Sequence, residues 1–136
     1  MTRQAIASTN APGALGPYSQ AIDTGGLVFC AGQVGLDPVT GKLVPGGLAA
    51  EAARACENLA GVLAAAGLGL ADVVKTTVYV VDLAEFGVVN EAYGRYFAAP
   101  HPARATVQVV ALPAGARVEI EAIAARGDAV PRRQGM

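Results

Sequence analysis

The feature that most constrains the fold is a change of hydrophobic period at residue 48. From there to residue 66, apolar side chains recur at steps of three and four, the period of an α-helix with one buried face. These positions are Leu48, Ala52, Ala55, Leu59, Val62, Leu63 and Ala66. Gly67 marks the expected end of the helix. The next segment, residues 72–82, is dense in β-branched residues and is predicted to be a buried strand. The chain therefore combines helix and sheet.

Further strands are predicted before and after this helix and strand along the chain. Residues 3–8 are predicted as a short strand, and residues 18–35 as two strands around a turn at residues 24–26. Asp82 is expected to cap a second helix, with Glu85 in capping-box register. The apolar face of that helix is Phe86, Val89, Tyr93 and Phe97. Residues 103–112 and 116–125 are the last two predicted strands. We therefore expect an α+β fold, a mixed six-stranded sheet with two helices packed on one face.

The other face of this sheet has no cover in the predicted order. Charged residues make up only 15% of the chain and hydrophobic residues 53%, which favours apolar surface buried between subunits. We expect residues 1–127 to form a single domain and residues 128–136 a flexible C-terminal tail.

The composition also narrows the possible partners. The net charge is −1, the basic residues are scattered and Trp is absent, so we expect no nucleic-acid partner. The uncharged stretch 59–71 has 13 residues, too few to cross a bilayer, and the N-terminus lacks a signal-peptide pattern. We therefore expect no membrane association and a cytoplasmic location. Cys30 and Cys56 lack metal-type spacing and are predicted to be buried, reduced thiols.

Arg104 is the most informative charged residue, because no acidic residue lies within ten positions on either side. Side-chain alternation gives each of the last two strands one polar row, namely Arg104, Thr106 and Gln108 in one and Arg117, Glu119 and Glu121 in the other. If these strands form a regular hairpin, Glu119 faces Gln108 and Arg104 lies ~13 Å away along the strand. Either the strands are not neighbours, or Arg104 keeps its guanidinium free for a ligand carboxylate. Solvated edge rows remain the alternative.

Other candidate residues carry weaker signals. His101 lies between two prolines without a nearby nucleophile and is interpreted as a passive loop residue. Lys75 could act as a Schiff-base lysine, but an ordinary strand lysine is the simpler interpretation. The sequence contains no metalloprotease, nucleophile-elbow, P-loop or dinucleotide-binding motif. We therefore expect no metal and no cofactor.

Several segments together resemble the RidA (YjgF) family of reactive-intermediate deaminases. They are "APGALGPYSQA" (11–21), "VFCAGQVGLDPVTGKLV" (28–44), "ADVVKTTVYVVDLAEFGVVNEAYGRYF" (71–97), "PARATV" (102–107) and "LPAGARVEIEAIA" (112–124). The resemblance covers residues 3–126. It implies a chorismate-mutase-like fold, a homotrimer with active sites between subunits, and hydrolysis of 2-iminobutanoate and 2-iminopropanoate to 2-oxo acids and ammonia.

The resemblance also implies roles for individual residues. Arg104 matches the arginine that holds the substrate carboxylate, and Glu119 matches the glutamate that activates the attacking water. The implied substrate-binding positions are Tyr18, Gly32, Asn90 and Thr106. Thr106 stands where many relatives carry cysteine, so a thiol-specific role is absent here, although its hydroxyl can still form a hydrogen bond.

Two other classes of function remain open at this point. A non-catalytic, regulatory or chaperone-like trimer would use the Arg104 pocket to bind 2-oxo acids. The presence of Glu119 favours catalysis, because carboxylate binding alone does not require it. A ribonuclease or translation inhibitor is disfavoured by the net charge of −1 and the single histidine.

Overall fold

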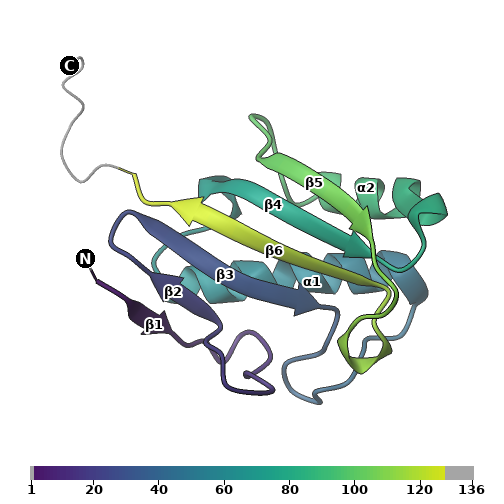
Figure 1. Ribbon diagram of the computed structural model, residues 1–136, viewed down its shortest axis with the longest axis horizontal. Coiled ribbons are helices and arrows are strands. Elements are labelled where there is room, and N and C mark those ends of the chain that lie inside the picture. Colours follow the sequence, from purple (N-terminus) through teal and green to yellow (C-terminus); the bar gives the residue numbers. More distant parts are fainter. Residues whose placement is uncertain (1, 128–136) are drawn as a thin grey trace.

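The structure is a computed structural model that describes residues 2–127, and within them the chain forms a six-stranded sheet and two α-helices (Figure 1). The strands are β1 Gln4–Ile6, β2 Ala21–Asp23, β3 Leu27–Val34, β4 Val73–Val80, β5 Ala103–Gln108 and β6 Val118–Ala125. The helices are α1 Gly47–Ala65 and α2 Phe86–Gly94. The α+β prediction is confirmed. The tail predicted at residues 128–136 lies outside the described residues.

The order of strands across the sheet is β1-β2-β3-β6-β4-β5. β4 and β5 run parallel, whereas the other neighbouring pairs are antiparallel, so the sheet is mixed as predicted. The hairpin considered for the last two strands is wrong, because β6 lies between β3 and β4 while β5 pairs with β4. The physical reason is that α2 connects β4 to β5, and such a crossover gives parallel strands. The strands carrying Arg104 and Glu119 are therefore not neighbours.

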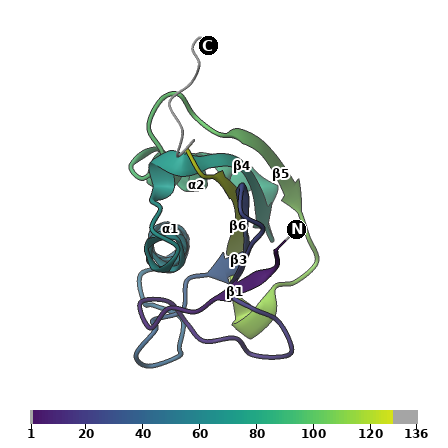
Figure 2. The same cartoon turned by 90° about the vertical axis from the view of Figure 1, so that its left-hand side faces the viewer.

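The main hydrophobic core lies between α1 and the sheet (Figure 2). Every predicted apolar position of α1 is buried, with Leu59, Val62 and Leu63 completely so. They pack in one cluster with alternate residues of the sheet, among them Val28, Val78 and Ile120. In the view of Figure 2, α1 lies along one side of the sheet, and the opposite side has no α-helix within residues 2–127, only the short 3-10 turn Pro113–Gly115.

α2 begins through a 3-10 turn, Leu83–Glu85, rather than through the predicted capping box. The Asp82 carboxylate accepts a hydrogen bond from the Ala84 N–H at 3.0 Å. The Glu85 N–H donates to the Asp82 carbonyl at 3.1 Å, which closes the turn. The helix then ends at Gly94, and Phe97 beyond it stacks on Tyr93 with ring centroids 4.4 Å apart. This segment brings aromatic rings under the start of β5.

Both cysteines are buried and free, as predicted. Burial raises the pKa of the Cys30 thiol to about 11 and that of Cys56 to about 12, so both are protonated at neutral pH. Within residues 2–127, neither helix has the length and hydropathy needed to span a bilayer.

Candidate active site divided between two faces of the sheet

Arg104 points toward α2, on the helix-covered face of the sheet. Its partner in β4 is Thr76, which is fully buried and hydrogen-bonded to the Tyr93 hydroxyl at 2.8 Å. The guanidinium carbon of Arg104 lies 4.8 Å from the centre of the Tyr93 ring and 5.3 Å from that of Phe86. Such cation–π contacts hold the guanidinium without occupying its N–H donors. Among the described residues, no carboxylate lies within 4 Å of it.

The hollow beside Arg104 is lined by Asn90, Tyr93, Gly94, His101 and Pro102. Asn90 comes from α2, and its Oδ1 is buried without a hydrogen-bond partner among residues 2–127. A buried acceptor without a donor is unusual in proteins, so this oxygen is available to a ligand. His101, interpreted from the sequence as a passive loop residue, stands at the wall of the same hollow. We refer to Arg104, Asn90 and His101 as the arginine half-site.

Thr106 follows Arg104 on the same face of β5. It lines a separate apolar recess with Leu83 and Phe86. Further along, the Gln108 side chain accepts a hydrogen bond from the Leu83 N–H at 2.8 Å. The predicted polar row of Arg104, Thr106 and Gln108 therefore exists, and it faces α2 and its leading turn, with Arg104 and Thr106 partly buried and Gln108 exposed.

Glu119 lies on the opposite, open face of the sheet. It is paired with Tyr79 of β4 and Val34 of β3, while its neighbours Val118 and Ile120 point into the core. Its hollow is lined by Tyr18, Gly32, Gln33, Leu36 and Pro113, among others. Burial raises the pKa of the Glu119 carboxyl above its ordinary value, and the negative charge of Glu121 raises it further. The elevated pKa makes Glu119 a stronger base than an exposed glutamate.

Gly32 brings the β3 backbone directly against Glu119. A Cβ placed on Gly32 would lie 2.8 Å from Cδ and 3.0 Å from Cγ of Glu119, distances that real side chains do not tolerate. The absence of a side chain at position 32 thus lets the Glu119 carboxyl lie across the strand. We refer to Tyr18, Gly32 and Glu119 as the glutamate half-site.

Tyr18 reaches the glutamate half-site from the loop before β2. Its hydroxyl accepts a hydrogen bond from the Leu15 N–H at 3.1 Å, and half of its surface, 50%, is exposed. Gln20 anchors this loop, because its side chain accepts from the Ser8 N–H at 2.6 Å and donates to the Pro12 carbonyl at 2.7 Å. Sequence reasoning missed this function of Gln20, although the residue lies within the segment "GPYSQA".

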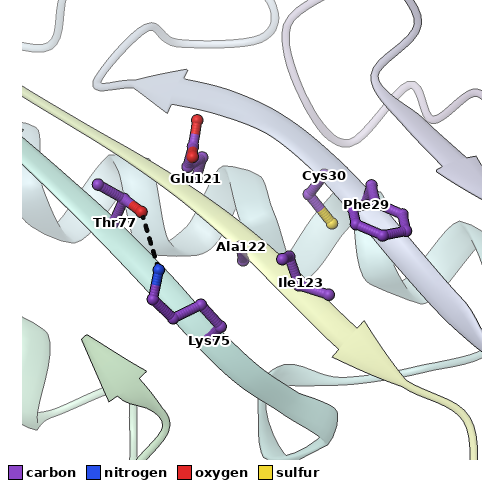
Figure 3. Close-up of a pocket in the computed structure, with 7 residues that line it drawn as sticks. All are labelled: Phe29, Cys30, Lys75, Thr77, Glu121, Ala122 and Ile123. Carbon is purple, nitrogen blue, oxygen red and sulfur yellow. Dashed lines mark hydrogen bonds between the residues drawn. The ribbon is translucent and has the colours of Figure 1, made fainter. Parts of the chain in front are cut away.

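Lys75 belongs to neither half-site. It lies on the open face with Thr77 and Glu121, in a hollow further along the sheet (Figure 3). Its Nζ lies 3.5 Å from the Thr77 hydroxyl. The structure thus separates Lys75 from both Arg104 and Glu119. Among the described residues, no group of three or more His, Cys, Asp or Glu side chains could hold a metal ion.

The six predicted site residues therefore fall into two sets. Arg104, Asn90 and Thr106 lie on the helix-covered side, and Tyr18, Gly32 and Glu119 on the open side. The fold and these hollows define an α+β protein whose candidate ligand-binding groups are divided between two faces of one sheet.

Comparisons with known proteins identify the family. A family model described as "Endoribonuclease L-PSP" matches residues 8–126. The mouse (Mus musculus) 2-iminobutanoate/2-iminopropanoate deaminase is 54% identical, over 92% of this chain and 93% of its own. RidA from the Antarctic bacterium Psychrobacter sp. PAMC 21119 has a TM-score of 0.88 at 46% identity, over 91% of this chain and 100% of that one. E. coli TdcF with bound serine has a TM-score of 0.85 at 41% identity, over 91% and 99%. The chain belongs to the RidA (YjgF) family.

Proposed function

We propose that this protein hydrolyses 2-imino acids, such as 2-iminobutanoate and 2-iminopropanoate, to 2-oxo acids and ammonia. The observation that carries this proposal is the complementarity of the two half-sites. One presents an unpaired guanidinium, suited to a carboxylate, and the other presents a carboxyl group with a raised pKa, suited to activate water. The name of the mouse relative agrees with this chemistry.

A second copy of the chain would complete the site. Arg104 and Glu119 lie on opposite faces of the sheet, so the two residues of one subunit are badly placed to hold one small ligand. The open face exposes apolar side chains, including Phe29 at 43% and Val107 at 42%, as expected of a surface covered by another subunit. We therefore propose that residues 1–127 act as one domain in a homotrimer. The arginine half-site of each subunit would then meet the glutamate half-site of its neighbour.

In the proposed mechanism, Arg104 holds the substrate carboxylate through two parallel N–H donors. Glu119 takes a proton from water as the water oxygen attacks the imine carbon, forming a carbinolamine. Glu119 then returns the proton to nitrogen. As the C–N bond breaks, Glu119 takes the hydroxyl proton of the carbinolamine, which yields the 2-oxo acid and ammonia, and the ammonia carries that proton away as ammonium. A protonated imine is already electrophilic, so positioning and proton transfer are enough for this reaction.

The remaining site residues would orient the substrate and the water. Tyr18 and the Gly32 backbone border the place where the water would lie, next to Glu119. Asn90 supplies the buried acceptor Oδ1 for a donor on the substrate or on the adjacent subunit. Thr106 provides a hydroxyl on the same face of β5, two residues from Arg104. We also propose that the protein works in the cytoplasm, where cell fractionation would locate it.

A coupled assay tests the proposed activity. A threonine dehydratase generates the imine, and the purified protein should accelerate its disappearance. We expect Arg104→Ala and Glu119→Gln each to reduce this acceleration by about 100-fold or more, since each removes a charged contact to the reacting groups. Arg104→Lys keeps the charge but loses the planar pair of donors, so it should recover only part of the activity.

Two further measurements, together with the coupled assay, separate the other classes of function. Calorimetric binding of 2-oxobutanoate without turnover by the wild-type protein would refute catalysis and favour a regulatory binder. RNA cleavage that persists through purification and is lost in Glu119→Gln would favour the ribonuclease. Imine hydrolysis by Arg104→Ala at the wild-type rate would refute the role of Arg104 as the carboxylate anchor.

A further inference from the structure

Two rows of side chains run side by side along the open face, one on β4 and one on β6. The strand register pairs Tyr79 with Glu119, and Thr77 with Glu121. All four alternate with buried core residues and so lie on the same side of the sheet. Figure 3 shows the far end of these rows, where Thr77 and Glu121 lie beside Lys75. Glu121 is two residues from Glu119 on the same face, which places their Cα atoms about 7 Å apart along the strand.

The groups that face Glu119 carry no compensating positive charge within residues 2–127. β6 contributes Glu121, β4 contributes Tyr79, and the N-terminal loop contributes Tyr18. β3 contributes Gly32 and Gln33, which do not titrate. Arg117, two residues before Glu119 in the same row, is paired with Glu51 of α1 at 3.8 Å. Lys75, further along β4, forms no ion pair with either glutamate. The Glu119 carboxyl therefore experiences the charge of Glu121 without an opposing partner.

The Tyr79 hydroxyl is affected by both carboxylates, Glu119 and Glu121. Burial raises the pKa of its hydroxyl, the negative charge of Glu121 raises it further, and Glu119 adds to the same effect. The Glu121 charge also raises the pKa of Glu119 beyond the effect of burial. Coupling between two like charges at this separation is expected even where water partly screens them.

We propose that Glu121 is a positioning residue that acts through Glu119: its negative charge, held on the same face of the sheet, makes Glu119 a stronger base toward the attacking water. Glu121 itself touches neither substrate nor water in this arrangement. The inference rests on the proposed function, because it assigns a second carboxylate to the same proton transfer. The proton passes from water to Glu119 and back to nitrogen, and Glu121 changes only the ease of that transfer.

The decisive experiment measures the titration of Glu119 directly. Carbon-13 NMR of the glutamate carboxyl groups gives the titration midpoint of Glu119 in the wild-type protein. The signal of Glu119 is identified as the one that is lost in Glu119→Gln. In Glu121→Gln, which keeps the side-chain shape, we expect the Glu119 midpoint to fall by about 0.5–1.5 pH units. Glu57→Gln is the matched control, because it removes the same charge on α1, on the side of the sheet opposite to Glu119. There Glu57 accepts a hydrogen bond from the Tyr96 hydroxyl at 2.5 Å. The control should leave the midpoint of Glu119 unchanged.

The pH profile of kcat/KM for imine hydrolysis provides the second readout. A base must be ionised to act, so the acidic limb should move to lower pH in Glu121→Gln, and the plateau rate should fall because the base is weaker. Both proteins are assayed with the same imine, so the protonation of the substrate affects both pH profiles equally and does not contribute to the difference between them. An unchanged Glu119 midpoint, or a uniform loss of rate with the acidic limb in place, would overturn the inference. A shifted midpoint in a protein that hydrolyses no imine would support the coupling and refute the proposed function.

Discussion

At the scale of single residues, Arg104 combines a fixed position with a free charge. Phe86 and Tyr93 contact its guanidinium, so the side chain is ordered before any ligand arrives. Ordering in advance reduces the conformational entropy that a ligand must remove on binding. An arginine that was neutralised by a neighbouring carboxylate would lose this advantage, because the ligand would first have to displace that carboxylate.

Gly32→Ala provides a test of the glutamate half-site. The new methyl group would collide with the end of the Glu119 side chain, which can swing away, and the φ angle at this position is not one that requires glycine. We therefore expect the stability to change by less than about 1 kcal/mol while imine hydrolysis falls at least about tenfold. Urea unfolding and the coupled assay measure the two effects.

Gly26→Ala is the matched control for this change, because nothing lies within 4 Å of a Cβ at that position. It should leave both stability and activity close to wild type. Full activity in Gly32→Ala would contradict the assigned contact between Gly32 and Glu119.

For single residues, the sequence was informative only where the distance along the chain determines which residues are in contact. The isolation of Arg104 from acidic neighbours is visible in the sequence and persists in the structure. The proximity of Gly32 to Glu119 was not derivable from spacing, because it depends on the pairing of β3 with β6 across some 90 residues. The position of His101 beside Arg104 was missed for the same reason, since the loop that carries it has no periodic pattern.

At the scale of elements, the hydrophobic period predicted whether a segment forms a helix or a strand, but it did not determine which strands pair. The strong three-and-four pattern of α1 gave its bounds to within one residue, Gly47–Ala65 against the expected 48–66. The pairing of the last two strands stayed open in the sequence. Proximity along the chain favours a hairpin, whereas in the structure β6 lies between β3 and β4 and does not pair with β5. In that central position Val118, Ile120, Ala122 and Ala124 are all buried against α1.

Asn58 links α1 to the segment that follows β3, and Asn58→Ala tests that link. Its amide donates to the Val34 carbonyl at 3.1 Å and the Leu36 carbonyl at 2.9 Å, and the residue is fully buried. Removing it leaves the Leu36 carbonyl without this donor, whereas the Val34 carbonyl still accepts from the Leu36 N–H at 2.8 Å. We expect a loss of about 2–4 kcal/mol in the free energy of unfolding, from the lost hydrogen bonds and the lost packing of a fully buried side chain. Because Leu36 borders the glutamate half-site, activity at moderate urea should also fall earlier than in wild type.

Glu91→Gln serves as the control for the stability measurement. It removes only an exposed pair with Arg95 at 3.7 Å and should change stability by less than about 0.5 kcal/mol. If Asn58→Ala unfolded at the same urea concentration as this control, the two buried hydrogen bonds would contribute nothing measurable.

At the scale of the whole molecule, the division of the site between two faces has a consequence for assembly. The covered face carries the arginine half-site, and the open face carries the glutamate half-site. In the proposed homotrimer, one subunit would therefore offer two different surfaces to two neighbours. Contacts between two different surfaces close into a ring under cyclic symmetry, rather than pairing each surface with itself. The sequence suggested a covered sheet face through its sparse charge, but composition alone could not say which residues would meet across it.

Mixed oligomers test this arrangement. Arg104→Ala and Glu119→Gln subunits, each inactive alone, are co-expressed in equal amounts with one common tag, and all the oligomers are purified together. A working site needs an intact Arg104 from one subunit and an intact Glu119 from its neighbour, so random assembly should restore about one quarter of the sites. The matched control mixes wild type with the Arg104→Ala/Glu119→Gln double variant. Sites between subunits predict about one quarter of full activity for this mixture, whereas sites within single subunits predict about one half and no recovery at all in the first mixture.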